Sequence, residues 1–200
     1  MGKIDDARNV IGSSPEDMSR LDEQVMVELF ARDFVRASQL LSQGNSSGKQ
    51  TPEGAVLAGI IARAQGDVAK ATSSFQLARD RALRTLDERP NDPESISRLS
   101  VADAGLGRKD EAVREAKRAV ELCPMSQDAI DGAYYETMLA VAYAWTGERD
   151  AALSILEKMV RLPRSQNWGE LRFSPLWDDV RKDARFEQLI TQAALPPAYD

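Results

Sequence analysis

The chain has 200 residues, of which 42% are hydrophobic, 29% are charged and 6% are aromatic. These proportions are ordinary for a folded chain, and the low aromatic content with abundant alanine suits thin helical layers. The formal net charge is −6 and no basic stripe is present, which argues against nucleic-acid binding because phosphates must be neutralised. No run of eighteen apolar residues occurs, so the sequence predicts no membrane insertion.

Reactive residue types are scarce. Histidine is absent, which removes the commonest general base and metal ligand and every Ser-His or Cys-His pair. Cys123 is the single cysteine, so no internal disulfide can form, and a reducing compartment such as the cytoplasm is expected. We therefore predict no catalytic residue, no cofactor and no metal site.

The N-terminal quarter predicts a short lead-in segment, residues 1–14, and then a pair of helices over about 15–44. Apolar residues recur at helical spacing from Glu16 to Ala31 and again from Phe34 to Leu41. The turn between them, at Arg32-Asp33, lacks a glycine. The pair therefore has a less distinct boundary than those that follow.

A polar stretch, GNSSGKQT at residues 44–51, predicts a connecting loop. It resembles a phosphate-binding loop, in which backbone N–H groups cradle phosphates. The spacing is one residue short, however, Gln50 replaces the hydroxyl residue, and no strand precedes the stretch. We therefore interpret it as a loop without a nucleotide site.

Three further helix pairs are predicted, over about 52–90, 91–124 and 126–163. In the clearest, Asp92-Pro93 begins the first helix, Gly107 breaks the chain and Pro124 ends the second helix. In the pair before it, the second helix starts after Asp67 and runs on to residue 89. One alanine near the start of each second helix recurs at intervals of 34, 41 and 40 residues, at positions Ala37, Ala71, Ala112 and Ala152.

Residues 164–200 predict a C-terminal cap and tail. A loop over 164–169 is followed by a short helix that Ser174 caps and by a last helix that Asp183 caps. Trp177 and Phe186, with Leu189 and Ile190, are expected to cover the apolar face that the last pair exposes.

The pattern of Ser100, Ala102, Gly107, Ala112, Ala119 and Pro124 resembles the tetratricopeptide repeat, which has a period of about 34 residues. This resemblance implies an all-α fold: a right-handed superhelical solenoid of four tetratricopeptide-like helix pairs with a C-terminal helical cap. Asp131, Gly132, Tyr135 and the segment 171–190 also resemble the C-terminal tetratricopeptide region of bacterial signalling proteins. There, such arrays follow a serine/threonine kinase, an adenylate cyclase or a winged-helix regulator domain.

The resemblance also implies a partner-binding groove. In tetratricopeptide proteins the inner face is lined by the first helix of each pair, which here places on that face Met26, Leu29, Val56, Ile60, Arg63, Ser97, Val101, Ala104, Tyr134, Thr137, Val141 and Ala144. This face is mostly apolar, so we expect a non-catalytic scaffold that binds an apolar segment or helix of a protein partner.

Two alternatives stay open. In the first, the chain is a regulatory or oligomerising arm of a larger bacterial signalling enzyme or transcription regulator and forms, for example, a homodimer. In the second, the residues of the inner face pack against neighbouring helices or against the C-terminal cap and leave no groove.

Overall fold

The computed structural model describes residues 2–12, 18–46, 53–162 and 167–195, and these residues are all-helical, with no strand among them. The predicted all-α class is therefore confirmed. The elements in chain order are α1 (Gly2–Gly12), α2 (Met18–Phe30), α3 (Phe34–Ser46), α4 (Gly54–Gln65), α5 (Val68–Glu88), α6 (Pro93–Gly105), α7 (Lys109–Leu122), α8 (Asp131–Trp145), α9 (Arg149–Met159), α10 (Trp168–Phe173), the 3-10 helix η1 (Pro175–Trp177) and α11 (Ala184–Ala193).

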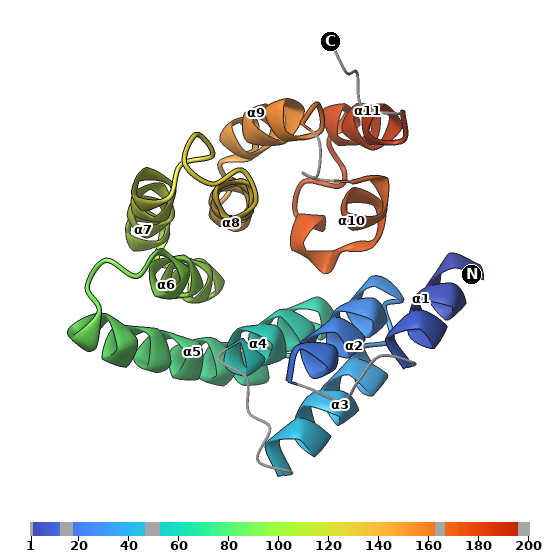
Figure 1. Ribbon diagram of the computed structural model, residues 1–200, viewed down its shortest axis with the longest axis horizontal. Helices are drawn as coiled ribbons and strands as arrows, with labels where there is room; N and C mark the ends of the chain where they lie inside the picture. Colours follow the sequence, from blue (N-terminus) through green and yellow to red (C-terminus); the bar gives the residue numbers. More distant parts are fainter. Residues whose placement is uncertain (1, 13–17, 47–52, 163–166, 196–200) are drawn as a thin grey trace.

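Consecutive helices pack as pairs: α2 with α3, α4 with α5, α6 with α7 and α8 with α9. Each pair also contacts the next pair along the chain. In Figure 1 the pairs follow an arc, with α2, α6 and α8 on its inner side and α3, α7 and α9 on its outer side. Pairing lets each helix bury an apolar face against its neighbours.

The same tight turn closes all four pairs. Its central residue has a positive φ of 58° to 86°, at positions Arg32, Gly66, Gly107 and Gly147. In each turn the next residue donates its N–H to the carbonyl five residues earlier at 2.8 to 2.9 Å, which is the pattern of a Schellman cap. The turns recur at intervals of 34, 41 and 40 residues, the same as the alanine series. Arg32 thus takes the place that glycine holds in the other three.

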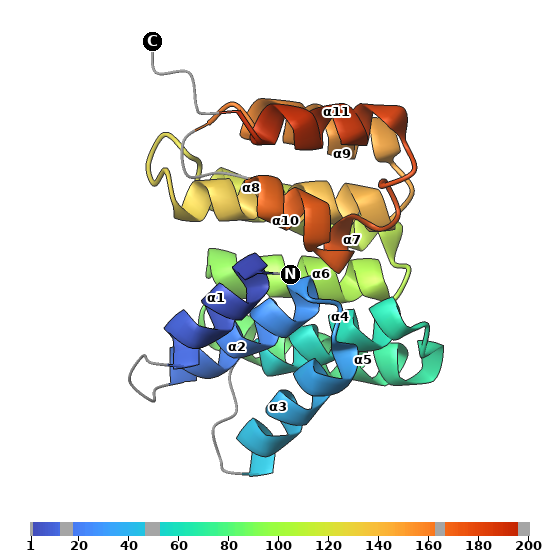
Figure 2. The same ribbon diagram turned by 90° about the vertical axis from the view of Figure 1, so that its right-hand side faces the viewer.

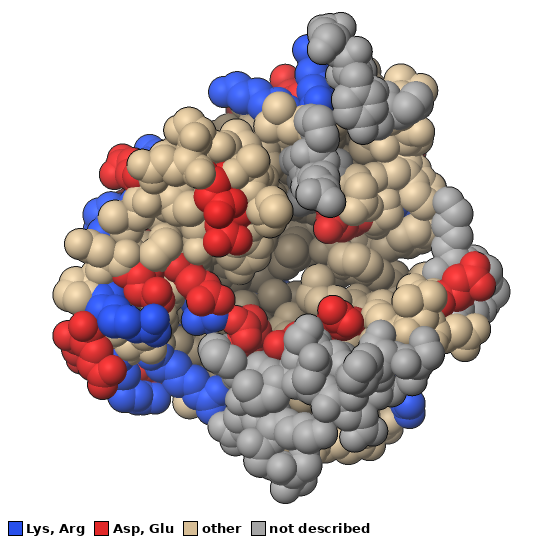
Figure 3. All heavy atoms as spheres, viewed as in Figure 1, with Lys and Arg blue, Asp and Glu red and all other residues tan. Residues whose placement is uncertain are grey.

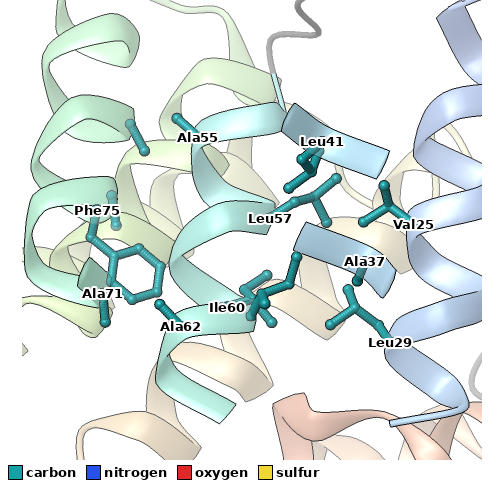
Figure 4. Packing of buried hydrophobic residues seen from close by; sticks show 13 residues of the cluster. Val25, Leu29, Ala37, Leu41, Ala55, Leu57, Ile60, Ala62, Ala71 and Phe75 are labelled. Atoms are coloured by element: carbon teal, nitrogen blue, oxygen red, sulfur yellow. The ribbon is translucent and has the colours of Figure 1, made fainter. Parts of the chain in front are cut away.

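Small residues let the paired helices approach closely. Ala37, Ala112 and Ala152 are fully buried, and the Ser100 hydroxyl donates to the Ala112 carbonyl oxygen across the α6–α7 crossing at 2.9 Å. Figure 4 shows how side chains of α2 to α5 meet in one apolar cluster around Leu29, Ile60 and other labelled residues. The recurring alanines are therefore packing positions.

The predicted helix starts are confirmed. The side chains of Asp67, Asp92, Ser174 and Asp183 each accept a backbone N–H at the start of the helix that follows. The long second helix of the second pair is also confirmed, because α5 has 21 residues and ends at Glu88.

Two predicted loops are shorter than expected where the structure describes them. Helix α3 continues to Ser46, while residues 47–51 of the predicted loop lie outside the described residues. Helix α10 begins at Trp168, inside the predicted loop 164–169, because Asn167 and Glu170 form a reciprocal capping box.

The C-terminal segment returns to the beginning of the arc. In Figures 1 and 2, α10 lies between α8 and α2, and α10 contacts α2 while η1 contacts both α4 and α8. Arg32 pairs with Asp178 at 2.5 Å, Arg63 pairs with Asp179, and the Trp145 indole N–H donates to the Leu176 carbonyl at 3.0 Å.

The predicted packing of this segment against the last pair is confirmed. Trp177, Phe186, Leu189 and Ile190 are 0% to 3% exposed and pack with side chains of α8 and α9. The arc is therefore closed by contacts of α2, α4 and the turn at Arg32 with the C-terminal segment, which the sequence did not predict.

Candidate partner-binding site

An apolar cavity of about 270 Å³ lies where the two ends of the arc meet. Three parts of the chain line it: α2, the first half of α8 with the residue before it, and the C-terminal segment. Figure 3, in the same view as Figure 1, shows a hollow near the centre of the molecule. The lining residues are Met26, Phe30, Ile130, Ala133, Tyr134, Thr137, Met138, Glu170, Ser174, Leu176 and Trp177. We call this space the central cavity.

A second cavity of about 660 Å³ adjoins the first. We call it the terminal cavity, because α1 lines it from the N-terminal end and α10 and α11 line it from the C-terminal end. Its walls include Ile4, Val27, Trp168 and Phe173. Phe30 and Glu170 line both cavities, so these two side chains lie at their common boundary.

Three of the twelve predicted site residues line the central cavity: Met26, Tyr134 and Thr137. Tyr134 is 44% exposed, whereas Thr137 is 7% exposed and its hydroxyl donates to the Ala133 carbonyl at 2.9 Å. The Tyr134 ring packs edge-on against Tyr135, with 5.4 Å between ring centroids. The accessible part of the predicted face is therefore concentrated at the two ends of the arc.

Seven other predicted residues are buried and offer little surface. Val101, Val141 and Ala144 are 0% to 3% exposed, and the last two pack in the cluster that contains Trp177. The remaining four are also at most 9% exposed: Leu29, Ile60, Ser97 and Ala104. At these positions the residues pack against neighbouring helices and the C-terminal cap, as the second alternative expects.

The last two predicted residues lie apart from the central cavity. Val56 lines a separate pocket between α4, α5 and α6, together with Arg98. Arg63 pairs with Asp179, and its guanidinium carbon lies 4.3 Å from the centroid of the Trp145 ring. Arg63 therefore helps to hold the two ends of the arc together.

Glu170 is the one charged side chain that lines either cavity among the residues that the structure describes. One of its carboxylate oxygens accepts the Asn167 N–H at 3.1 Å. Burial raises the pKa of this carboxyl group, and the Asn167 hydrogen bond partly opposes that shift. No Lys or Arg within the described ranges forms an ion pair with it.

Most of the residues that line the central cavity were not predicted from the sequence. Phe30 and Met138 belong to the predicted helices but lie one residue beside the positions that the repeat pattern selects. Trp177 was predicted only as a cap residue, and Leu176 was given no role. The spacing of Asn167 and Glu170, three residues apart, matches a capping box and could have predicted the helix start. The place of Glu170 in a cavity depends on the return of the chain to α2.

Comparisons with known proteins give no further assignment. No protein-family model matches the chain, and no curated protein matches it. Across the described ranges, no group of three or more Cys, Asp or Glu residues is arranged to hold a metal ion. None of the helices described here combines the length and apolar character needed to cross a bilayer.

Proposed function

We propose that the chain is a non-catalytic protein-interaction module, built from tetratricopeptide-like helix pairs, that binds an apolar segment of a partner in the central cavity. The observation that carries this proposal is the cavity itself: an open apolar space to which residues from both ends of the arc contribute. Concave, mostly apolar spaces with few polar groups are typical binding sites.

The repeat assignment is supported by the turn. Four positive-φ residues with the same hydrogen-bond pattern, and four buried or nearly buried alanines in the same register, indicate four copies of one unit. We extend this to a right-handed superhelical solenoid, as the resemblance implies, and to a cytoplasmic location, which the single cysteine favours. Because the scaffold is already ordered by its own core, binding would cost little further ordering of the chain.

Two partly exposed apolar residues that line the cavity provide a test. Ile130 is 66% exposed and Tyr134 is 44% exposed. The double substitution Ile130→Gln/Tyr134→Gln removes apolar contact without adding charge. A matched control is Val68→Gln/Leu77→Gln, since these residues are 77% and 45% exposed and line neither cavity.

Short random peptides displayed on phage would be selected against the wild-type chain, and their affinities measured by fluorescence anisotropy. We expect the cavity variant to weaken binding about tenfold or more, because two apolar contacts are lost, and the control to change it less than about twofold. Equal effects of the two variants would contradict the proposal. Circular dichroism would check that both variants keep the helical content of the wild type.

The alternative of an oligomerising arm predicts a different occupant. If a second copy fills the cavity, the sedimentation coefficient of the wild-type chain rises with concentration, and the cavity variant abolishes this rise. A coefficient that stays constant with concentration would rule out this alternative for the isolated chain.

A further inference from the structure

The charge pattern of the two cavities narrows the class of partner. Glu170 lies at the boundary of the central and terminal cavities, and every other described residue that lines either cavity is uncharged. A carboxylate in apolar surroundings is stabilised when a cation pairs with it, because its own hydration is reduced. A bound segment that lacked a cation would leave this carboxylate buried and unpaired.

The aromatic walls favour the same kind of ligand. Trp168 and Phe173, which flank Glu170 on α10, pack edge-to-face with 5.5 Å between ring centroids, and Phe30 faces both cavities. Aromatic rings attract ammonium and guanidinium groups, and the apolar stem of a Lys or Arg side chain packs well against them. An apolar cavity with one carboxylate thus suits the apolar stem and the cationic end of a Lys or Arg side chain.

The surface around the cavities has a complementary charge. Figure 3 shows several Asp and Glu residues around the hollow, while most Lys and Arg lie toward the outer edge of this face. Asp131 is the residue after Ile130, which lines the central cavity and is 66% exposed, and the whole chain has a formal net charge of −6. This distribution attracts a basic segment and repels an acidic one.

A structural role for Glu170 is also present, since its carboxylate closes the capping box with Asn167. That role does not require a charge, because Gln satisfies a capping box as well as Glu does. The substitution Glu170→Gln therefore keeps the cap and removes only the negative charge. The two roles can be separated by experiment.

We infer that the partner segment carries a Lys or Arg side chain that pairs with Glu170, while its neighbouring apolar residues fill the central cavity. This inference rests on the proposed function and adds the chemical class of its ligand: an apolar segment with at least one basic residue. Glu170 is then the residue that fixes the register of the bound segment.

The test is a double-mutant cycle on a peptide selected against the wild-type chain. The basic residue of the peptide is replaced by norleucine, which keeps the apolar stem and removes the charge. We expect this change to weaken binding to the wild type about tenfold, and binding to Glu170→Gln less than about twofold. The tenfold loss should also shrink at high salt, because added ions screen the pair.

The possible failures are distinct. If the selected peptides lack basic residues, or if norleucine has the same effect on both proteins, the pairing with Glu170 is wrong. In that case the proposed function still stands, provided that Ile130→Gln/Tyr134→Gln weakens binding and its control does not. If the cavity variant has no effect, the proposed function itself fails.

Discussion

A buried carboxyl pair between α6 and α7 should make the stability of the chain depend on pH. Asp103 of α6 is fully buried and accepts a hydrogen bond from the Arg79 Nε at 2.8 Å. One oxygen of Asp103 and one of Glu115 on α7 are buried and accept no hydrogen bond. A proton on Glu115 satisfies both oxygens, because the protonated Glu115 carboxyl can donate a hydrogen bond to Asp103. Burial, and then the negative charge of Asp103, raise the pKa of Glu115 to about 7.

The sign of the effect follows from the two pKa values of Glu115. In the unfolded chain the group titrates near 4.5, and in the folded chain near 7. Below pH 4.5 both states hold the proton and the pair is fully stabilising. As the pH rises toward 7 the unfolded state loses its proton first, so the free energy of unfolding falls.

The magnitude is set by the size of the shift and by the remaining exposure of Glu115. A shift of this size corresponds to about 3 kcal/mol for a fully buried group. The Glu115 side chain is 14% exposed, and Arg114 lies 3.7 Å away, so part of the charge is screened. We therefore expect a loss of about 1–2 kcal/mol between pH 4.5 and about 7.

The substitution Glu115→Gln isolates this effect. Its amide can donate to Asp103 at every pH but cannot titrate, so the variant lacks this part of the pH dependence. Urea unfolding followed by circular dichroism across this pH range gives the free energy of both proteins. The difference between wild type and variant should change by about 1–2 kcal/mol. A difference that stays constant with pH would refute the shared proton, since the variant changes only Glu115 and the titration of its partner Asp103.

Two further substitutions test the packing and the turns. A side chain at Gly105 would meet the fully buried Phe75 ring. The substitution Gly105→Ala should therefore lower the free energy of unfolding by about 1–3 kcal/mol, measured by thermal unfolding, and a change below about 0.5 kcal/mol would contradict this packing. Arg32 has a φ of 58°, so Arg32→Gly relieves about 1 kcal/mol of strain but loses the pair with Asp178. In an Asp178→Asn background, where that ion pair is already weakened, Arg32→Gly should raise the free energy of unfolding by about 1 kcal/mol, measured by urea unfolding. A lower free energy of unfolding in that background would show that Arg32 has another role.

The features predicted correctly from the sequence depend on local signals. Asp67, Asp92 and Asp183 cap helices through hydrogen bonds to residues at most three positions away, so residue type and order are enough to place them. The turn predicted at Gly107 carries the residue type that a positive φ favours. The turn at Arg32 has the same geometry without that residue type, which explains why its boundary was less distinct.

The candidate site depends on contacts that no local pattern contains. Arg32 and Asp178 are 146 residues apart, and Arg63 and Asp179 are 116 residues apart, yet these pairs hold the ends of the arc together. Periodicity identifies which face of a helix is apolar, but not which segment covers it. The inner face was therefore predicted as one long groove, whereas the structure leaves its accessible part at the central cavity.

Methionine methyl signals in an NMR titration test the central claim most directly. Met26 and Met138 line the central cavity, whereas Met125 and Met159 do not, and Met159 is only 1% exposed. On addition of a selected peptide, we predict that the Met26 and Met138 methyl signals shift together to saturation while those of Met125 and Met159 stay in place. Saturable binding that leaves the Met26 and Met138 signals unchanged would contradict the assignment of the central cavity as the binding site.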